Sequence, residues 1–322
     1  MSTRPVPLLA LVGPTASGKT EASIAIAEAL PAEIVCVDSM LAYRGMDVGT
    51  AKPTPDQRSR VRHHLIDLVE PAEPFSVAIF QSLARAAIDE IGRRGVRSLL
   101  VGGGGLYYRA VADGLEFPGT EPAVRRLLAS EAAVIGPDAL HDRLASFDRP
   151  AAQKIVATNV RRTVRALEVA AITGLPFSRY AEAWGRFPSG AVRAAGVGLP
   201  RPVLHRRIER RVRGMLPGLL EECRELLERG FGRFLTSTQA IGYAEAVACL
   251  EGGLAEDEAA TSIIRRTKAL ARRQLAWLRR DPRIRWFEAG EDGAGGIHVE
   301  LLRYLRGDDV QVPGFFEARA GV

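Results

Sequence analysis

Cysteine is scarce in this chain, with three residues among 322. Cys36, Cys223 and Cys249 lie far apart and show no metal-ligand spacing, which argues against a disulfide framework and a zinc site. The adjacent His63 and His64 lack a third ligand at a useful spacing, so we do not expect a histidine metal site. This composition suits a reducing cytosol, and we expect a cytoplasmic protein.

Long apolar runs are also missing. The first run, residues 6–12, contains a proline and leads straight into a glycine-rich loop, so it is too short for a signal peptide or a membrane span. No later run approaches the roughly 20 apolar residues that a membrane helix needs. We therefore expect a protein with no membrane partner.

The overall composition is that of a soluble globular protein. Hydrophobic residues make up 47% and charged residues 25%, which excludes a largely disordered chain. The length predicts two domains, or one domain with a sizeable insertion. The 44 basic residues exceed the 38 acidic ones and leave a net charge of +6, which is compatible with a solvated basic surface and with a polyanionic partner.

The first hundred residues alternate short apolar runs with helical patterns. We predict buried strands at 8–12, 34–37 and 98–101, and helices at 19–30 and 77–93. Continuous apolar strands that alternate with helices indicate a parallel sheet covered on both faces.

A phosphate-binding motif follows the first predicted strand and opens the first predicted helix. It reads Gly13-Pro14-Thr15-Ala16-Ser17-Gly18-Lys19-Thr20 and satisfies the P-loop pattern in its expected context. The glycines allow backbone N–H groups to turn around a diphosphate, and the helix N-terminus adds a favourable dipole. Lys19 would neutralise the terminal phosphate and the Thr20 hydroxyl would ligate Mg²⁺. The motif predicts a phosphate ligand without specifying which one.

Beyond about residue 118 the strand pattern gives way to helices. We predict short helices at 121–134, 138–145, 151–157 and 160–172, a weak strand at 192–199, and helices at 204–229 (interrupted near Pro217), 245–250 and 256–280. The predicted fold class is α/β, with a P-loop-type parallel sheet core flanked by helices, a helical insertion domain and a helical C-terminal third. The predicted divisions are 1–118 (first part of the core), 119–198 (insertion) and 199–322 (remainder of the core with basic helices).

Asp38 ends the second predicted strand. Because the carboxyl ends of parallel strands meet at one edge, Asp38 and the turn at residues 102–105 should face the P-loop across one crevice. The third strand runs into glycines and not into the acid that an ATPase usually places there. Asp38 itself could be that acid, so a nucleotide kinase remains an alternative.

The C-terminal helix carries an uninterrupted basic face. Arg265, Arg272 and Arg279 are seven residues apart, and a second row follows the same spacing; together with Lys268 they share one face, because a heptad drifts only about 20° around a helix. The second row is Arg266, Arg273 and Arg280. No acidic residue lies between positions 265 and 280, so we expect seven unpaired cations and a nucleic-acid phosphate surface.

Several blocks of sequence carry a family resemblance. They are Asp38-Ser39, YRGMDVGTAKP at 43–53, HHLID at 63–67, VGG at 101–103 with Leu106-Tyr107, RALEV at 165–169, QAIGY at 239–243 and RQLAWLR at 273–279. With the P-loop, they resemble the tRNA dimethylallyltransferase (tRNA isopentenyltransferase) family over nearly the whole chain. The blocks at 38–53 and 239–243 are the most specific.

The resemblance implies transfer of a dimethylallyl group from dimethylallyl diphosphate to N6 of the tRNA adenosine 3′-adjacent to the anticodon, with release of pyrophosphate. An adenine amino group is a poor nucleophile, so a base must take its proton, and Asp38 is placed for that role. The resemblance adds Thr15 and Arg125 at the reacting centre, with the donor and Mg²⁺ on residues 13–20. It implies tRNA contacts by Asp38, Ser39, Met40, Leu41, Gly104, Arg161, Arg162, Thr163, Val164 and Arg165, and we add Arg272 and Arg279 from the basic face. We expect a monomer.

Two positions depart from the family pattern. The family usually has threonine where this chain has Gly104, so a hydroxyl is missing that Ser39 or a backbone N–H would have to replace. Thr238 stands where methionine is frequent. Two other functions stay open: a nucleotide or small-molecule kinase, which leaves the basic face unexplained, and a non-catalytic RNA-binding protein, against which the intact Lys19, Thr20 and Asp38 argue.

Overall fold

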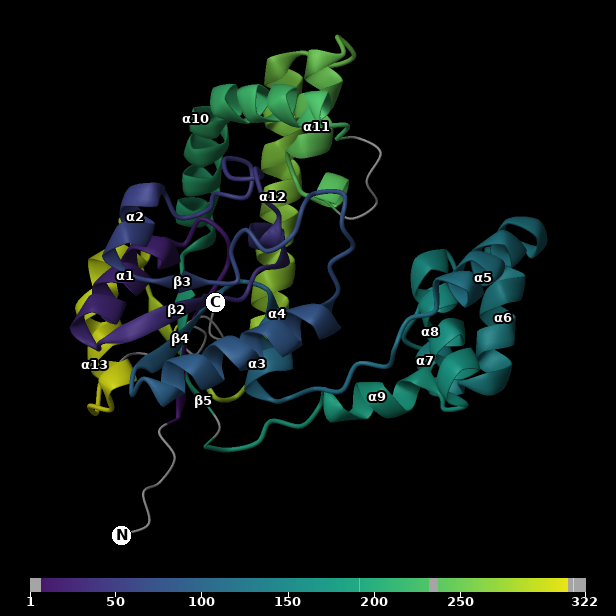
Figure 1. Ribbon diagram of the computed structural model, residues 1–322, viewed down its shortest axis with the longest axis horizontal. Helices are drawn as coiled ribbons and strands as arrows, with labels where there is room; N and C mark the ends of the chain where they lie inside the picture. The colour runs from purple at the N-terminus through teal and green to yellow at the C-terminus, as the bar shows by residue number, and fades with distance from the viewer. Residues whose placement is uncertain (1–6, 191, 232–236, 312–314, 316–322) are drawn as a thin grey trace. The chain divides into compact units, whose positions relative to one another are not determined.

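The computed structural model describes residues 7–190, 192–231, 237–311 and 315, and its central feature is a parallel sheet (Figure 1). The sheet has six strands in the order β3-β2-β4-β1-β5-β6, and every neighbouring pair is parallel. The strands are β1 (Leu8–Val12), β2 (Ala32–Cys36), β3 (His63–His64), β4 (Arg97–Gly102), β5 (Val192–Gly198) and β6 (Ile284–Glu288). The predicted α/β class is confirmed. The sheet also contains β3 and β6, which the sequence patterns did not predict.

Helices cover both faces of this sheet. The chain moves from β1 through α1 to β2 and back through α3 to β4, and right-handed crossovers in opposite directions place α1 and α3 on opposite faces. Helix α13 packs against α1, and α4 packs against α3 (Figure 1). The bounds are α1 (Lys19–Ala29), α2 (Pro55–Arg60), α3 (Val77–Arg93), α4 (Gly105–Ala112), α11 (Tyr243–Leu250), α12 (Glu256–Leu278) and α13 (His298–Arg306), with 3₁₀ turns η1 (Ser39–Ala42), η2 (Ser237–Gln239) and η3 (Gly293–Ile297).

Helix α10 (Arg201–Glu228) passes through Pro217 without a break, so the predicted interruption there is wrong. A proline inside a helix removes one backbone hydrogen bond and bends the helix. In Figure 1 the helix changes direction midway along its length. Leu216, Leu219 and Leu220 are buried on either side of the proline, and this packing holds the helix together.

The chain divides into two compact units, of which the larger comprises residues 1–114 and 188–322 and the smaller residues 115–187. The smaller unit contains α5 (Pro122–Ile135), α6 (Pro137–Phe147), α7 (Arg149–Ala152), α8 (Val160–Thr173) and α9 (Phe177–Ala183). It has its own apolar core, which includes Leu128, Leu140 and Leu144. Strand β5 lies inside the predicted insertion 119–198 but pairs with β1 in the sheet, so the compact helical unit is shorter than that segment. Among the described residues, no helix has both the length and the apolar character that a membrane crossing requires.

Candidate active site

The P-loop connects β1 to α1 and is held from outside by two other parts of the larger unit. The Ala16 carbonyl accepts a 2.9 Å hydrogen bond from Arg207 Nε, and the Ser17 carbonyl accepts one of 2.8 Å from the Ala294 N–H. Gly18, at the N-cap of α1, has a left-handed φ of 85°, which a residue with a side chain adopts only with strain. These contacts fix the course of the loop around the helix N-terminus.

Lys19 is folded back onto the loop. Its Nζ donates hydrogen bonds to the Pro14 carbonyl at 2.6 Å and to Ser17 Oγ at 3.2 Å. Burial, and then the positive charge of Arg211, lower the pKa of Lys19 to about 7, although Asp38 acts in the opposite direction. A bound anion would reverse this shift, because it would supply the negative charge that the buried ammonium group lacks.

Two cavities adjoin each other at the carboxyl edge of the sheet. The first, of about 370 Å³, is lined by the P-loop from Thr15 to Thr20 and by three arginines of α10: Arg207, Arg210 and Arg211. The second, of about 510 Å³, has a mainly apolar wall that includes Tyr107, Ile208, Met215, Ile263, Leu270 and Trp277. Both cavities share the lining residues Thr15, Asp38, Thr50, Gly103, Arg211 and Gln274. A cationic compartment therefore meets an apolar one at Thr15 and Asp38.

Asp38 is placed at this junction by the end of β2 and the start of η1. Its carboxylate accepts a 3.0 Å hydrogen bond from the Met40 N–H and caps η1. Burial raises the pKa of Asp38 above its ordinary value, and the Met40 bond and the charges of Lys19 and Arg211 offset only part of that effect. A carboxylate with a raised pKa is a stronger proton acceptor than an exposed one, as a general base requires.

The neighbouring residues that we predicted as tRNA contacts also line these cavities. Ser39, Met40 and Gly104 line the apolar cavity, and Leu41 lines the cationic one. A methyl group at Gly104 would lie 3.0 Å from the Val37 carbonyl oxygen and 3.3 Å from Tyr107 Cδ2. A side chain at position 104 would therefore fit only after a small shift of its neighbours.

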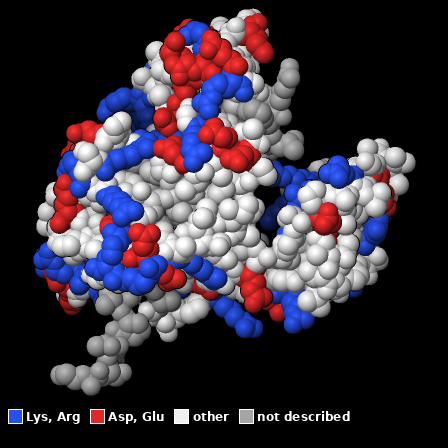
Figure 2. Space-filling view, viewed as in Figure 1, with Lys and Arg blue, Asp and Glu red and all other residues white. Residues whose placement is uncertain are grey.

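The basic face of α12 differs from the prediction of seven unpaired cations. Arg266 pairs with Glu245 of α11 at 2.7 Å, and Lys268 pairs with Glu209 of α10 at 2.5 Å. The acidic partners come from other helices, which is why their absence within α12 was misleading. Arg265, Arg272, Arg273, Arg279 and Arg280 are exposed. On the face of the larger unit seen in Figure 2, basic and acidic side chains are interspersed.

In the smaller unit, Arg125 and Arg165 both bind the buried Glu168. Each guanidinium lies 2.7 Å from Glu168 Oε2. Burial by itself would raise the pKa of Glu168, but hydrogen bonds from Arg125 and Arg165 outweigh it and hold this pKa below the ordinary value. Thr163 and Val164, which we predicted as tRNA contacts, have buried side chains in this unit, whereas Arg161 and Arg162 are exposed. Side-chain contacts with a nucleic acid are therefore open to these two arginines and not to Thr163 or Val164.

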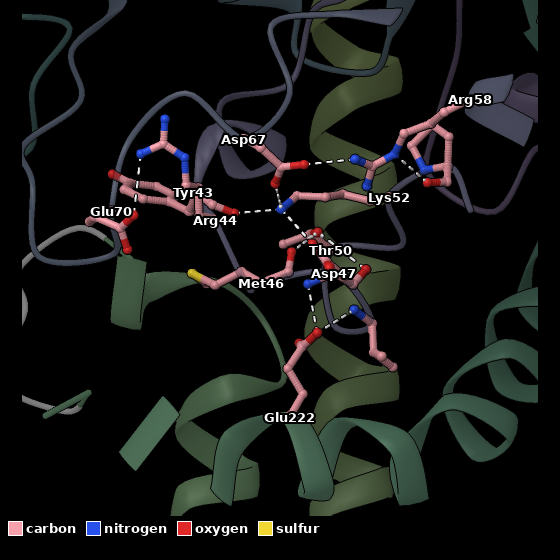
Figure 3. Close-up of polar contacts among 12 residues, drawn as sticks. Tyr43, Arg44, Met46, Asp47, Thr50, Lys52, Arg58, Asp67, Glu70 and Glu222 are labelled. Carbon is pink, nitrogen blue, oxygen red and sulfur yellow. Dashed lines mark hydrogen bonds and ion pairs between the residues drawn. The ribbon is translucent and has the colours of Figure 1, made fainter. Parts of the chain in front are cut away.

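A polar network stabilises the segment 43–53, which supplies Gly49 and Thr50 to the cavity walls (Figure 3). Lys52 Nζ is buried and donates to the Tyr43 carbonyl at 2.5 Å and to Asp47 and Asp67 at 2.6 Å each. The Glu222 carboxylate of α10 accepts N–H bonds from residues 47, 48 and 49, at 2.6, 2.7 and 3.2 Å. The residues of this segment that resemble the family therefore have a structural role, because their hydrogen bonds hold one wall of the cavities in place.

Sequence reasoning missed the polar side chains that α10 and α12 bring to the site. Arg207 and Arg211 are one helical turn apart, and this spacing of cations in a helix was a usable signal. Gln274 of α12 is buried and accepts a 2.8 Å hydrogen bond from the Thr15 N–H. Gln274 lies in the block 273–279 that carries the family resemblance, but that block gives no sign of a contact with Thr15, which is 259 residues away.

The chain is similar to known proteins over most of its length. A family model described as IPP transferase matches residues 41–281, and one described as Isopentenyl transferase matches residues 6–69. A tRNA dimethylallyltransferase of Kineococcus radiotolerans is 48% identical over 306 residues, which cover 92% of this chain and 95% of that protein. One of Salinispora tropica is 47% identical, with 93% and 92% covered.

Two solved structures are also similar to this chain. The tRNA isopentenylpyrophosphate transferase of Bacillus halodurans is 39% identical and has a TM-score of 0.65, and the match covers 94% of this chain and 97% of that one. A eukaryotic dimethylallyltransferase acting on tRNA is 21% identical, with a TM-score of 0.76 over 98% of this chain and 84% of that one, and it shares the fold.

Proposed function

Because the chain belongs to the tRNA dimethylallyltransferase (IPP transferase) family, we propose that it transfers the dimethylallyl group of dimethylallyl diphosphate to N6 of the tRNA adenosine 3′-adjacent to the anticodon. The observation that carries the chemistry is the junction of the two cavities at Thr15 and Asp38. The cationic cavity suits a diphosphate. The apolar cavity has room for a prenyl tail and a flipped base.

At the carbon that is transferred, the reaction forms one bond and breaks one, and a proton moves from N6 to Asp38. The adenine N6 attacks C1 of the dimethylallyl group, and the bond from C1 to the diphosphate oxygen breaks. Asp38 accepts the proton that N6 loses, and pyrophosphate leaves with the bonding electrons. Lys19, Arg207, Arg210 and Arg211 line the cationic cavity, where they would stabilise the negative charge that develops on the leaving group.

The residues around Thr20 fit Mg²⁺ as it binds to phosphates. Among the described residues there is no cluster of three or more His, Cys, Asp or Glu side chains that would enclose a metal. Mg²⁺ commonly uses few protein ligands and keeps water and phosphate oxygens around it. Thr20 lines the cationic cavity, and its hydroxyl would be such a ligand. When bound, the ion supplies further charge compensation to the diphosphate.

The tRNA would contact the exposed cations of both units. In the larger unit these are Arg272, Arg273 and Arg279, next to the apolar cavity that Arg273 lines. In the smaller unit they are Arg161 and Arg162. Arg125 remains a candidate for the reacting centre. We also propose that the protein is a monomer. A cytoplasmic location is supported by its three free thiols, which suit a reducing compartment.

Transfer without ATP distinguishes this function from a kinase. A kinase must hold the β- and γ-phosphates of ATP and transfer a phosphoryl group, whereas a prenyltransferase needs only the diphosphate of its donor. The purified protein with Mg²⁺ should move label from dimethylallyl diphosphate into tRNA in the absence of ATP. Phosphorylation of a small acceptor from ATP, with no prenyl transfer to tRNA, would overturn the proposal.

A further inference from the structure

Gln274 connects the basic helix α12 to the P-loop through a buried hydrogen bond. The residue is 9% exposed, and its Oε1 accepts the N–H of Thr15 at 2.8 Å. Backbone N–H groups of a P-loop usually turn toward the phosphate. The N–H of Thr15 instead donates to a side chain of α12. This hydrogen bond orients the loop, and the N–H is not available to the donor.

The other end of the Gln274 amide fills the space beside Gly103. A methyl group at position 103 would lie 2.4 Å from Gln274 Nε2 and 2.8 Å from the Gly13 carbonyl oxygen. Real side chains do not approach so closely, so any larger residue at 103 would displace the amide. Gln274 is thus wedged between the P-loop and the turn after β4, which form two walls of the site.

Gln274 lies where the two cavities meet. It lines both of them, as do Thr15 and Asp38. The residues on either side of it in sequence are Arg273, which lines the apolar cavity, and Leu275, which packs against the core. Helix α12, which carries the exposed cations, is therefore joined to the P-loop by a hydrogen bond of Gln274.

We propose that Gln274 is a positioning residue. It holds the P-loop, and Thr15 in particular, so that a donor bound there is aligned with the acceptor base in the apolar cavity. This inference rests on the proposed prenyl transfer. Gln274 acts through the Thr15 backbone, so its loss should affect the alignment of the donor with the attacking nitrogen more than the affinity for either substrate. A misplacement of about 1 Å can reduce a rate by about 100-fold.

The test compares single-turnover rates at saturating dimethylallyl diphosphate and tRNA anticodon stem-loop. Gln274→Met keeps the length of the side chain but cannot accept the bond, and its rate should fall about 10–100-fold. The dissociation constants of pyrophosphate and of the stem-loop should stay within about threefold of the wild type. Gln274→Glu keeps an oxygen acceptor for the Thr15 N–H and should recover at least part of the lost rate. Ala276→Gln, an exposed change on the same helical turn, serves as the control and should leave the rate unchanged.

Three results would overturn the proposal. They are a wild-type rate in the Met variant, a rate in the Met variant that returns to the wild-type value when the substrate concentrations are raised, and a Glu variant no faster than the Met variant. The two variants share one site and differ in the acceptor, so a general folding defect would reduce both equally and count against the proposal. A wild-type protein that transfers no prenyl group would refute the proposed function itself. An active wild type with an equally active Met variant would refute only the role of Gln274.

Discussion

Lys19 and Asp38 face the same cavity with opposite charges, and burial shifts each of them toward its neutral form. The pKa of Lys19 falls to about 7 and that of Asp38 rises. Neither group forms an ion pair with the other within 4 Å, because Lys19 donates to the Pro14 carbonyl and Asp38 accepts from the Met40 N–H. The two groups are therefore separately available, one to a diphosphate and one to a proton.

Asp38→Asn keeps the shape of the side chain and removes its ability to accept a proton. We expect the single-turnover rate to fall about 10²–10⁴-fold, the usual contribution of a general base. In the wild type the rate should rise with pH through a pKa above the ordinary aspartate value, because the deprotonated form is active and burial raises this pKa. Single-turnover rates as a function of pH check both points. A near-normal rate in the Asn variant would remove Asp38 from the mechanism.

Lys19 should take up a proton when a diphosphate binds above neutral pH. With a pKa of about 7, the free protein holds Lys19 largely neutral at pH 8, and a bound anion favours the charged form. We expect uptake approaching one proton per site at pH 8 and less at pH 6. Calorimetry of pyrophosphate binding in two buffers of different ionisation enthalpy measures it, and Lys19→Arg, which stays charged throughout, is the control. Equal uptake in the Arg variant would assign the proton to another group.

The elements differ in how well sequence predicts them. Strands β1, β2 and β4 are continuous apolar runs, and the weak pattern at 192–199 is also a strand, β5. Strand β3 has only two residues, so it shows no periodic pattern of hydrophobic residues. The hydrophobic alternation of β6 is too short to be recognised as a strand. The P-loop and the strand-end position of Asp38 are local features, so both were predictable. The partners of Arg266 and Lys268 lie 21 and 59 residues away on other helices, and no pattern within α12 reveals them.

The cations of α12 fall into two groups, those that form ion pairs with acidic residues and those that are exposed without such a partner among the described residues. The salt dependence of tRNA binding can distinguish the contributions of the two groups. Arg272 and Arg273 are exposed and form no hydrogen bond or ion pair with any other described residue. Replacing both with alanine should weaken stem-loop binding and lower the slope of log K against log salt by about 1–2, because each phosphate contact releases about one counterion. Filter binding between 50 and 200 mM salt, roughly the range over which such slopes are read, measures it.

The matched control for that prediction is the double variant Arg266→Ala and Lys268→Ala. These cations are already paired with Glu245 and Glu209, so their removal should change the slope by less than half as much. An equal change of slope in both double variants would show that Arg266 and Lys268 interact with the RNA in spite of their acidic partners.

In the whole molecule, the proposed donor site lies within one of two units that have separate cores. The cationic cavity is lined entirely by residues of the larger unit, and the core around Leu128 and Leu140 belongs to the smaller one. Arg125, Arg161 and Arg162 are carried by the smaller unit, so donor binding and part of the proposed tRNA binding are assigned to different units. Such separation predicts that the two units respond differently to a donor-site ligand.

Pyrophosphate with Mg²⁺ should therefore stabilise the larger unit selectively. A ligand at 100 times its Kd stabilises the folded form that binds it by about 2.7 kcal/mol, which corresponds to a Tm increase of about 5–10 °C for a unit of this size. Calorimetry should resolve a transition that shifts by this amount, and hydrogen exchange should show protection in α1 and α10 while α5 and α8 exchange as before. Lys19→Ala, which removes a charge from the donor cavity, should abolish the shift. Equal protection of both units would mean that they unfold as one cooperative body, and no shift with either protein would place the diphosphate elsewhere.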